Sequence, residues 1–256
     1  MSDQPTVPTT AESVDGLIEL AKARAQAGDA AGAGRTFAAA LHLAELHGLY
    51  GPTARAQTWL AGVDVKNGKL ALARQRLDLA WQLCQAHDLS AQVRGEVGAQ
   101  LGQVLVFQGH AGAGAALMYQ AISDLQTAGQ SRQAEELELA LAAVCSRVDR
   151  AVDETPPGSI ERVHALLRRA RTRLGVGQSV AARADLCTAW DSATQLPNRL
   201  RAHIGHDYGK LLVAAGPQHA AQARAVLQAA RMLSSDDPER CAELDALLAD
   251  TAMPAR

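Results

Sequence analysis

Residues 28–40 read GDAAGAGRTFAAA, and this stretch predicts the corner and the second helix of a helical hairpin. Counting from Gly28, a small residue lies five positions on, a large apolar residue nine on and an alanine twelve on. The same offsets recur after Gly68, Gly109 and Gly177. The motif residues are Ala33, Phe37 and Ala40, then Ala73, Leu77 and Ala80, then Gly114, Met118 and Ala121, and last Ala182, Leu186 and Ala189. The first three corners lie 40 and 41 residues apart, so the pattern predicts hairpins that stack to bury their apolar faces.

The composition favours closely packed helices over sheets. Apolar residues make up 48% of the 256 residues but aromatic residues only 3%, so alanine, leucine and valine must build the core. The formal net charge of -2 gives no global field that would attract nucleic acid or an acidic membrane. Arginine far outnumbers lysine, which is typical of a GC-rich bacterial gene and makes each arginine weak evidence for phosphate binding.

The cysteine spacing and the N-terminal residues favour a cytoplasmic protein. The four cysteines form no CxxC pair, which predicts reduced core thiols, with a disulfide or a metal site as the alternative. They are Cys84, Cys145, Cys187 and Cys241. The first residues lack the apolar stretch of a signal peptide, and no apolar run approaches the roughly 20 residues that span a bilayer. We therefore expect a soluble, cytoplasmic protein without a membrane segment.

Helical periodicity and chain breakers divide the sequence. Residues 1–11 predict a disordered tail, 12–250 a helical repeat domain and 251–256 a second tail. The expected hairpins occupy 12–27 with 31–47, 53–67 with 70–87, 90–108 with 112–128, 159–175 with 179–195 and 198–215 with 218–233, and a capping helix occupies 238–250. Residues 131–154 form either one long helix or a hairpin with a short second arm. The consecutive prolines Pro156 and Pro157 end the helix and predict a joint near 149–158.

The motif resembles the tetratricopeptide repeat (TPR), in its variety with longer helices. The first helix of that family carries W-x2-L-G and the second A-x3-F. The matching segments here are Leu17-x2-Leu20-Ala21, Gly98-x2-Leu101-Gly102, Ala33-x3-Phe37, Ala73-x3-Leu77, Gly114-x3-Met118 and Ala182-x3-Leu186. The first-helix Trp and the closing Pro of the family are absent, and the period exceeds its roughly 34 residues. The resemblance implies an all-α, TPR-like superhelix, a solenoid of helical hairpins with a C-terminal capping helix; plain packing of alanine-rich helices is the alternative.

The resemblance also implies where a partner would bind. In that family the first helices of the hairpins line a concave groove that holds a peptide or a partner helix. The groove candidates carried over onto this sequence are Arg55, Lys66, Gln103, Phe107, His164, Arg168, Arg171, His203 and Lys210. Among them Phe107 either provides an exposed aromatic anchor or packs against the next hairpin.

Helix 159–175 carries the most concentrated charge. Its formal charge is +4, from five arginines and one glutamate: Arg162, Arg168, Arg169, Arg171, Arg173 and Glu161. Arg168 and Arg171 share a helical face, and we expect them near Arg201 or Lys210 of the next hairpin. Such a cluster predicts a clamp for carboxylates or phosphates. The alternative is a solvated face whose arginines pair with acids elsewhere.

No catalytic motif, phosphate-binding loop or cofactor site occurs, so we expect no enzyme, no cofactor and no metal. His203 and His206 lie one turn apart, as half of a zinc site without further ligands. The expected function is a non-catalytic scaffold or adaptor that binds a protein or peptide partner, an acidic one if Arg168 and Arg171 take part. The alternatives are a regulator that contacts nucleic acid through helix 159–175, which lacks nearby stacking aromatics, and a self-associating structural protein.

Overall fold

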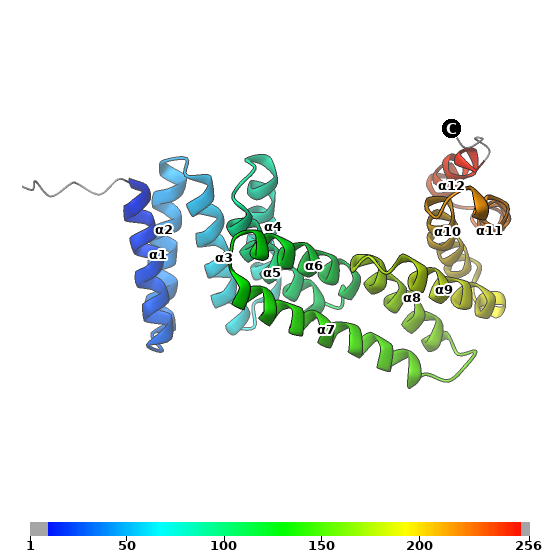
Figure 1. Ribbon diagram of the computed structural model, residues 1–256, viewed down its shortest axis with the longest axis horizontal. Helices are drawn as coiled ribbons and strands as arrows, with labels where there is room; N and C mark the ends of the chain where they lie inside the picture. The colour runs from blue at the N-terminus through cyan, green and yellow to red at the C-terminus, as the bar shows by residue number, and fades with distance from the viewer. Residues whose placement is uncertain (1–9, 252–256) are drawn as a thin grey trace, which may run out of the picture. The chain divides into compact units, whose positions relative to one another are not determined.

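The computed structural model describes residues 10–251, which form antiparallel helical hairpins without any strand (Figure 1). The α-helices are α1 (Thr10–Gln26), α2 (Ala30–Leu46), α3 (Tyr50–Lys66), α4 (Leu70–Ala86), α5 (Ala91–Phe107), α6 (Ala111–Thr127), α7 (Ser131–Asp153), α8 (Ile160–Gly175), α9 (Ser179–Ser192), α10 (Asn198–Ala214), α11 (Ala220–Leu233) and α12 (Pro238–Asp250). Short 3-10 helices follow α9 and precede α11, at Ala193–Gln195 and Pro217–His219. The predicted all-α hairpin array is confirmed.

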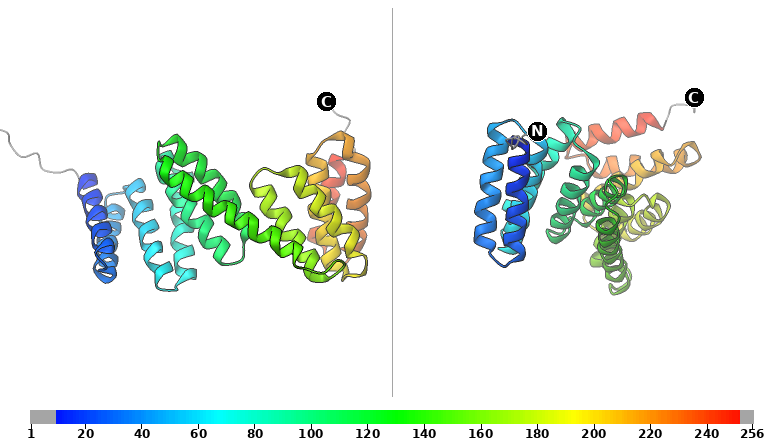
Figure 2. Two further views of the ribbon diagram at one scale, coloured as in Figure 1. Left: turned by 60° about the horizontal axis from the view of Figure 1, so that its bottom comes forward. Right: turned by 60° about the vertical axis from the view of Figure 1, so that its left-hand side comes forward.

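The chain divides into two compact units, Met1–Ala142 and Ala143–Arg256, with the boundary inside α7. In the first unit α1 pairs with α2, α3 with α4 and α5 with α6, and the pairs lie side by side (Figures 1 and 2). In the second unit α8 pairs with α9 and α10 with α11, and α12 packs on α11. The predicted joint near 149–158 stays a prediction. The predicted tails lie outside the described residues, apart from positions 10, 11 and 251.

Helix α3 starts earlier than expected, and the open choice for residues 131–154 is resolved. Helix α3 begins at Tyr50, three residues before the predicted start, so Pro52 lies in its first turn rather than in the preceding loop. Pro is tolerated there because the first N–H groups of a helix have no partner to lose. Residues 131–153 form one continuous helix of 23 residues, which settles the choice between a long helix and a hairpin.

The corner glycines and the small helix residues explain why the hairpins close tightly. Gly28, Gly68, Gly109 and Gly177 all have φ between 74° and 87°, a region that residues with a Cβ seldom adopt. Between α5 and α6 the backbones approach closely at Gly102. A Cβ on Gly102 would lie 2.7 Å from Met118 Cγ and 2.8 Å from the carbonyl oxygen of Gly114. Small residues at these positions therefore set the distance between the two helices of a hairpin.

A pair of side chains joins the two helices at each of these corners, and we call it the corner pair. One member lies four residues before the corner glycine and the other eight residues after it. The corner pairs are Arg24–Thr36, Asp64–Arg76, Leu105–Leu117 and Arg173–Asp185. The position is constant, but the residue types differ. Arg24 and Thr36 form a hydrogen bond, Asp64 and Arg76 an ion pair, and Arg173 and Asp185 an ion pair of reversed order, whereas Leu105 and Leu117 belong to one apolar cluster.

Side-chain caps fix the ends of several helices. The Asp29 carboxylate accepts a hydrogen bond of 2.7 Å from the Gly32 N–H at the start of α2. Ser159 caps α8 and Asp237 caps α12 in the same way, as their sequence positions suggest. None of the helices between residues 10 and 251 is long and apolar enough to cross a membrane.

Candidate functional site

A pocket of about 310 Å³ opens on the first unit between α3 and α5. Its floor contains two aromatic rings, because Phe37 and Trp59 stack with their centroids 5.7 Å apart. Lys22 Nζ lies 4.8 Å from the centroid of the Trp59 ring and also donates to Glu19 at 2.7 Å. Val63 and Val104 add aliphatic walls. The first unit thus has an apolar pocket between α3 and α5, which are the first helices of their hairpins.

The rim of this pocket combines an exposed aromatic ring with unpaired polar groups. Phe107 is the last residue of α5, and 67% of its surface is exposed. Lys66 ends α3 and is the only charged residue that lines the pocket. Within residues 10–251, the Lys66 ammonium and the amides of Gln100 and Gln103 have no hydrogen-bond or ion-pair partner. A peptide bound here could therefore contact an apolar surface and accept hydrogen bonds from the Lys66 ammonium and the two glutamine amides.

Three of the predicted groove residues meet at this pocket, namely Lys66, Gln103 and Phe107. Of the two orientations left open for Phe107, the exposed one is found. Arg55 does not join them, because its guanidinium donates to Asp15 at 2.7 Å and lies 3.8 Å from Glu19. Arg55 therefore holds α3 against α1.

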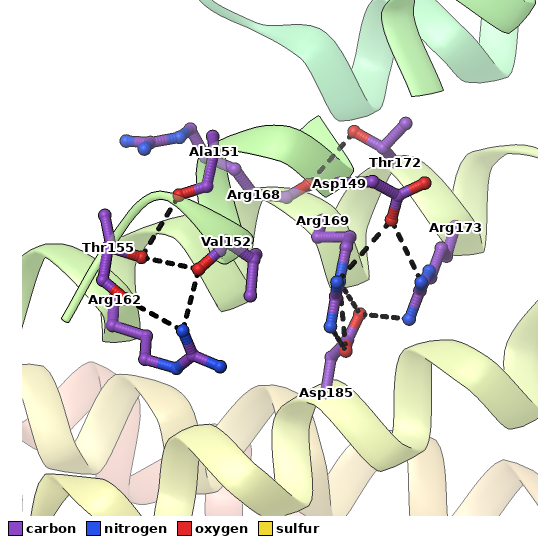
Figure 3. A network of polar contacts seen from close by, with 10 residues as sticks. All are labelled: Asp149, Ala151, Val152, Thr155, Arg162, Arg168, Arg169, Thr172, Arg173 and Asp185. Atoms are coloured by element: carbon purple, nitrogen blue, oxygen red, sulfur yellow. Dashed lines mark hydrogen bonds and ion pairs between the residues drawn. The ribbon is translucent and has the colours of Figure 1, made fainter. Parts of the chain in front are cut away.

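In the second unit, the arginines of α8 are largely paired with acids (Figure 3). Arg169 Nη2 donates to Asp185 at 2.6 Å, and Arg173 Nη1 donates to the same carboxylate at 2.8 Å. Arg173 also donates to Asp149 at 3.0 Å. Arg162 donates to the carbonyl oxygens of Val152 at 2.8 Å and Thr155 at 2.9 Å. These arginines stabilise the packing of α7, α8 and α9. Arg169 and Arg173 fit the alternative in which the arginines of this helix pair with acids, whereas Arg162 pairs with backbone carbonyl oxygens.

Arg171 has partners on α10. Its Nη2 donates to Asp207 at 3.0 Å and contacts His203 Nε2. Burial, together with the nearby Arg171, holds the pKa of His203 below its ordinary value despite the opposing effect of Asp207. A neutral His203 can accept a hydrogen bond from Arg171. The guanidinium of Arg201, one of the two expected neighbours, packs over the Trp190 ring at 4.9 Å, and its proximity to Arg168 and Arg171 stays a prediction.

The remaining predicted residues of the second unit stay accessible. His164, Arg168 and Lys210 are exposed, and none of the three side chains has a hydrogen-bond or ion-pair partner in the described part of the chain. In Figure 3 the guanidinium of Arg168 points away from Asp149 and Asp185. Arg168 is therefore the arginine of α8 that is free to meet a ligand.

The histidine pair and the cysteines do not assemble into a metal site. His203 and His206 both lie near Asp207, at 3.7 Å and 3.5 Å. No group of three or more His, Cys, Asp or Glu residues between positions 10 and 251 is arranged to hold a metal ion. All four cysteines are free thiols.

The sequence prediction missed the pocket floor and the aspartate partners. Phe37 and Trp59 belong to different hairpins, and only the stacking of repeats brings their rings together. Asp185 could have been found, because it directly precedes the large apolar residue of its motif, Leu186. That position faces the first helix of the same hairpin, so a charged residue there requires a partner of opposite charge.

Comparison with known proteins yields resemblances in fold only. No protein-family model and no curated protein matches the chain. The TPR2AB domain of yeast Sti1, solved in a complex with pHSP90, shares 18% identity over 95% of this chain and 100% of its own, with a TM-score of 0.38. A Podosopora anserina structure titled as a kinesin light chain with nearly identical TPR-like repeats shares 15% identity over 91% of this chain and 100% of its own, with a TM-score of 0.41. A TPR protein from Parabacteroides merdae shares 15% identity over 94% and 99% of the two chains, with a TM-score of 0.32.

Proposed function

We propose that this chain is a non-catalytic scaffold or adaptor of the bacterial cytoplasm, whose first unit holds a segment of a protein or peptide partner. The observation that carries the proposal is the pocket at Lys66 and Phe107, where an apolar hollow with a stacked aromatic floor opens to solvent. An exposed aromatic ring at the edge of an apolar pocket is typical of surfaces where proteins bind one another.

The pocket favours a bulky apolar side chain of the partner. Such a side chain would cover Phe107 and contact Trp59 and Val104. Covering roughly 100 Å² of the Phe107 surface at about 25 cal/mol per Å² contributes about 2.5 kcal/mol. That amount lies in the range of single residues that dominate a protein interface.

The free charges favour an acidic group beside this apolar side chain. Lys66 is the only charge in the pocket lining, so a carboxylate of the partner would meet a cation without an acidic competitor. In the second unit Arg168 offers a similar group, whereas Arg171 would first have to leave Asp207. We therefore assign the acidic preference to Lys66 and Arg168. The pairing of Arg169, Arg171 and Arg173 with aspartates argues against a nucleic-acid surface on this helix.

Affinity capture with quantitative mass spectrometry tests the proposal. Proteins retained by the wild-type chain should be lost with Phe107→Ser and reduced with Lys66→Glu. The matched control is Tyr119→Ser, which removes another half-exposed aromatic ring, 54% exposed, from α6 of the same unit. The proposal is refuted if Phe107→Ser retains every partner of the wild-type chain, or if Tyr119→Ser loses the same ones.

A further inference from the structure

The first unit carries a second pocket, at the opposite end of its helices from Phe107. This pocket of about 390 Å³ lies between the loop after α2, the start of α3 and the last turns of α4. Tyr50, Leu79 and Leu83 give it an apolar lining, and Glu45 is the only charged residue in that lining. A cavity of roughly 150 Å³ already accommodates a benzene ring, so the volume of this pocket is sufficient for an aromatic side chain.

The two ends of the unit differ in charge. At the corner end, Lys66 and Lys69 flank the turn between α3 and α4, and neither has an acidic partner in the described residues. At the loop end, the Glu45 carboxylate has no ion-pair partner within residues 10–251, and the fully exposed Asp88 makes only a 3.4 Å contact with Arg94. Phe107 and two lysines without acidic partners thus belong to the same unit as an apolar pocket whose Glu45 has no ion-pair partner among residues 10–251.

We propose that a second copy of this chain docks on the first unit, placing its Phe107 in the pocket at Tyr50 and Leu79 and its Lys66 against Glu45. Tyr50 and Lys66 are the first and last residues of α3, whose 17 residues span roughly 25 Å. The two contact surfaces therefore lie at opposite ends of α3. Contacts between them give a closed antiparallel pair where both surfaces face one side of the unit, and a ring or a filament where they do not.

This association competes with the proposed partner binding. Docking covers Phe107 and Lys66, the residues that would receive the partner segment. A bound partner should therefore release the copies from one another. The self-association itself needs no partner, so its test is independent of the proposed function.

Sedimentation velocity on the purified full-length chain over a concentration series provides the test. The wild-type chain should sediment above its monomer mass of 26.9 kDa, with a mean mass that rises with concentration. Phe107→Ser and Leu79→Ser should each raise the concentration needed for association at least tenfold. Tyr119→Ser, on a surface outside both contacts, should leave it unchanged.

Reversing the charges of Lys66 and Glu45 tests whether these two residues meet in the contact. Lys66→Glu alone and Glu45→Lys alone should each remain monomeric, because each places like charges across the contact. An equimolar mixture of the two variants should associate again, because every contact in the mixture can join opposite charges. A wild-type chain that stays monomeric up to a few hundred micromolar overturns the proposal. So does an association that Phe107→Ser leaves intact, or a mixture of the charge variants that stays monomeric.

Discussion

The ion-pair network of α8 and α9 leads to a quantitative prediction for Asp185→Asn. The Asp185 side chain accepts hydrogen bonds from Arg169 and Arg173, and only 3% of the residue is exposed. Removing one partner of a buried ion pair costs about 3–5 kcal/mol, because the other charge stays buried without compensation. Here the two arginine side chains keep 17% and 24% exposure, and Asp149 remains as an ion-pair partner of both, at 3.6 Å from Arg169 and 3.0 Å from Arg173. We therefore expect a loss of about 2–3 kcal/mol, just below that range.

Native-state hydrogen exchange measures this loss where it occurs. A change of about 2–3 kcal/mol corresponds to roughly 30- to 150-fold faster exchange of the protected amides in α8 and α9. The amides of α3 and α5, in the other unit, should be unaffected. Asp149→Asn is the matched control, because the Asp149 side chain is 47% exposed and its removal should cost less than about 1 kcal/mol. The reasoning is refuted if Asp185→Asn exchanges like the wild-type chain, or if the two variants are indistinguishable.

Three further predictions concern other parts of the chain. Gly102→Ala should lower the free energy of unfolding by about 1–3 kcal/mol, and with it the midpoint of thermal unfolding, because the added methyl group collides with Met118. Gly62→Ala is the control and should change this midpoint little, because the added methyl group has only one neighbour, at 3.7 Å. Burial raises the pKa of the Cys84 thiol to about 11 from the ordinary 9.0, so the folded chain keeps a proton that the unfolded chain loses. The free energy of unfolding should consequently fall as the pH rises from about 9 to 11, and denaturant titrations should show less of this fall in Cys84→Ala. Ser159→Ala removes the hydrogen bond to the Arg162 N–H and should cost about 1 kcal/mol in urea unfolding, a value that a loss below about 0.3 kcal/mol would contradict.

The hairpins could be predicted from the sequence because their determinants are local. A corner glycine and a small-x3-large motif mark the packed surface of a hairpin, so α4 and α6 begin and end within one residue of the expected positions. The start of α3 at Tyr50 differs from the expected residue 53 because a proline in the first turn costs no hydrogen bond, so Pro52 is part of the helix.

The candidate site was only partly predictable because it depends on contacts between hairpins. The helix positions of Lys66, Gln103 and Phe107 indicated a common face, and these three residues line one pocket. The partners of Arg171 and Arg173 did not follow from helix positions, since Asp207 and Asp149 lie 36 and 24 residues away along the chain. Which acid an arginine reaches depends on side-chain conformations that periodicity does not encode.

The corner pairs have a consequence for how a chain of similar repeats folds. Neighbouring repeats of nearly the same motif can pair a first helix with the second helix of another repeat, a common error in the folding of repeat proteins. Exchanging the second helices of two hairpins here would bring Asp64 against Asp185, or Arg173 against Arg76. Either encounter buries two like charges at the corner, which is unfavourable by several kcal/mol. The reversed order of the ion pairs therefore disfavours an exchange of second helices between the α3/α4 and α8/α9 hairpins, although the surrounding alanines are interchangeable.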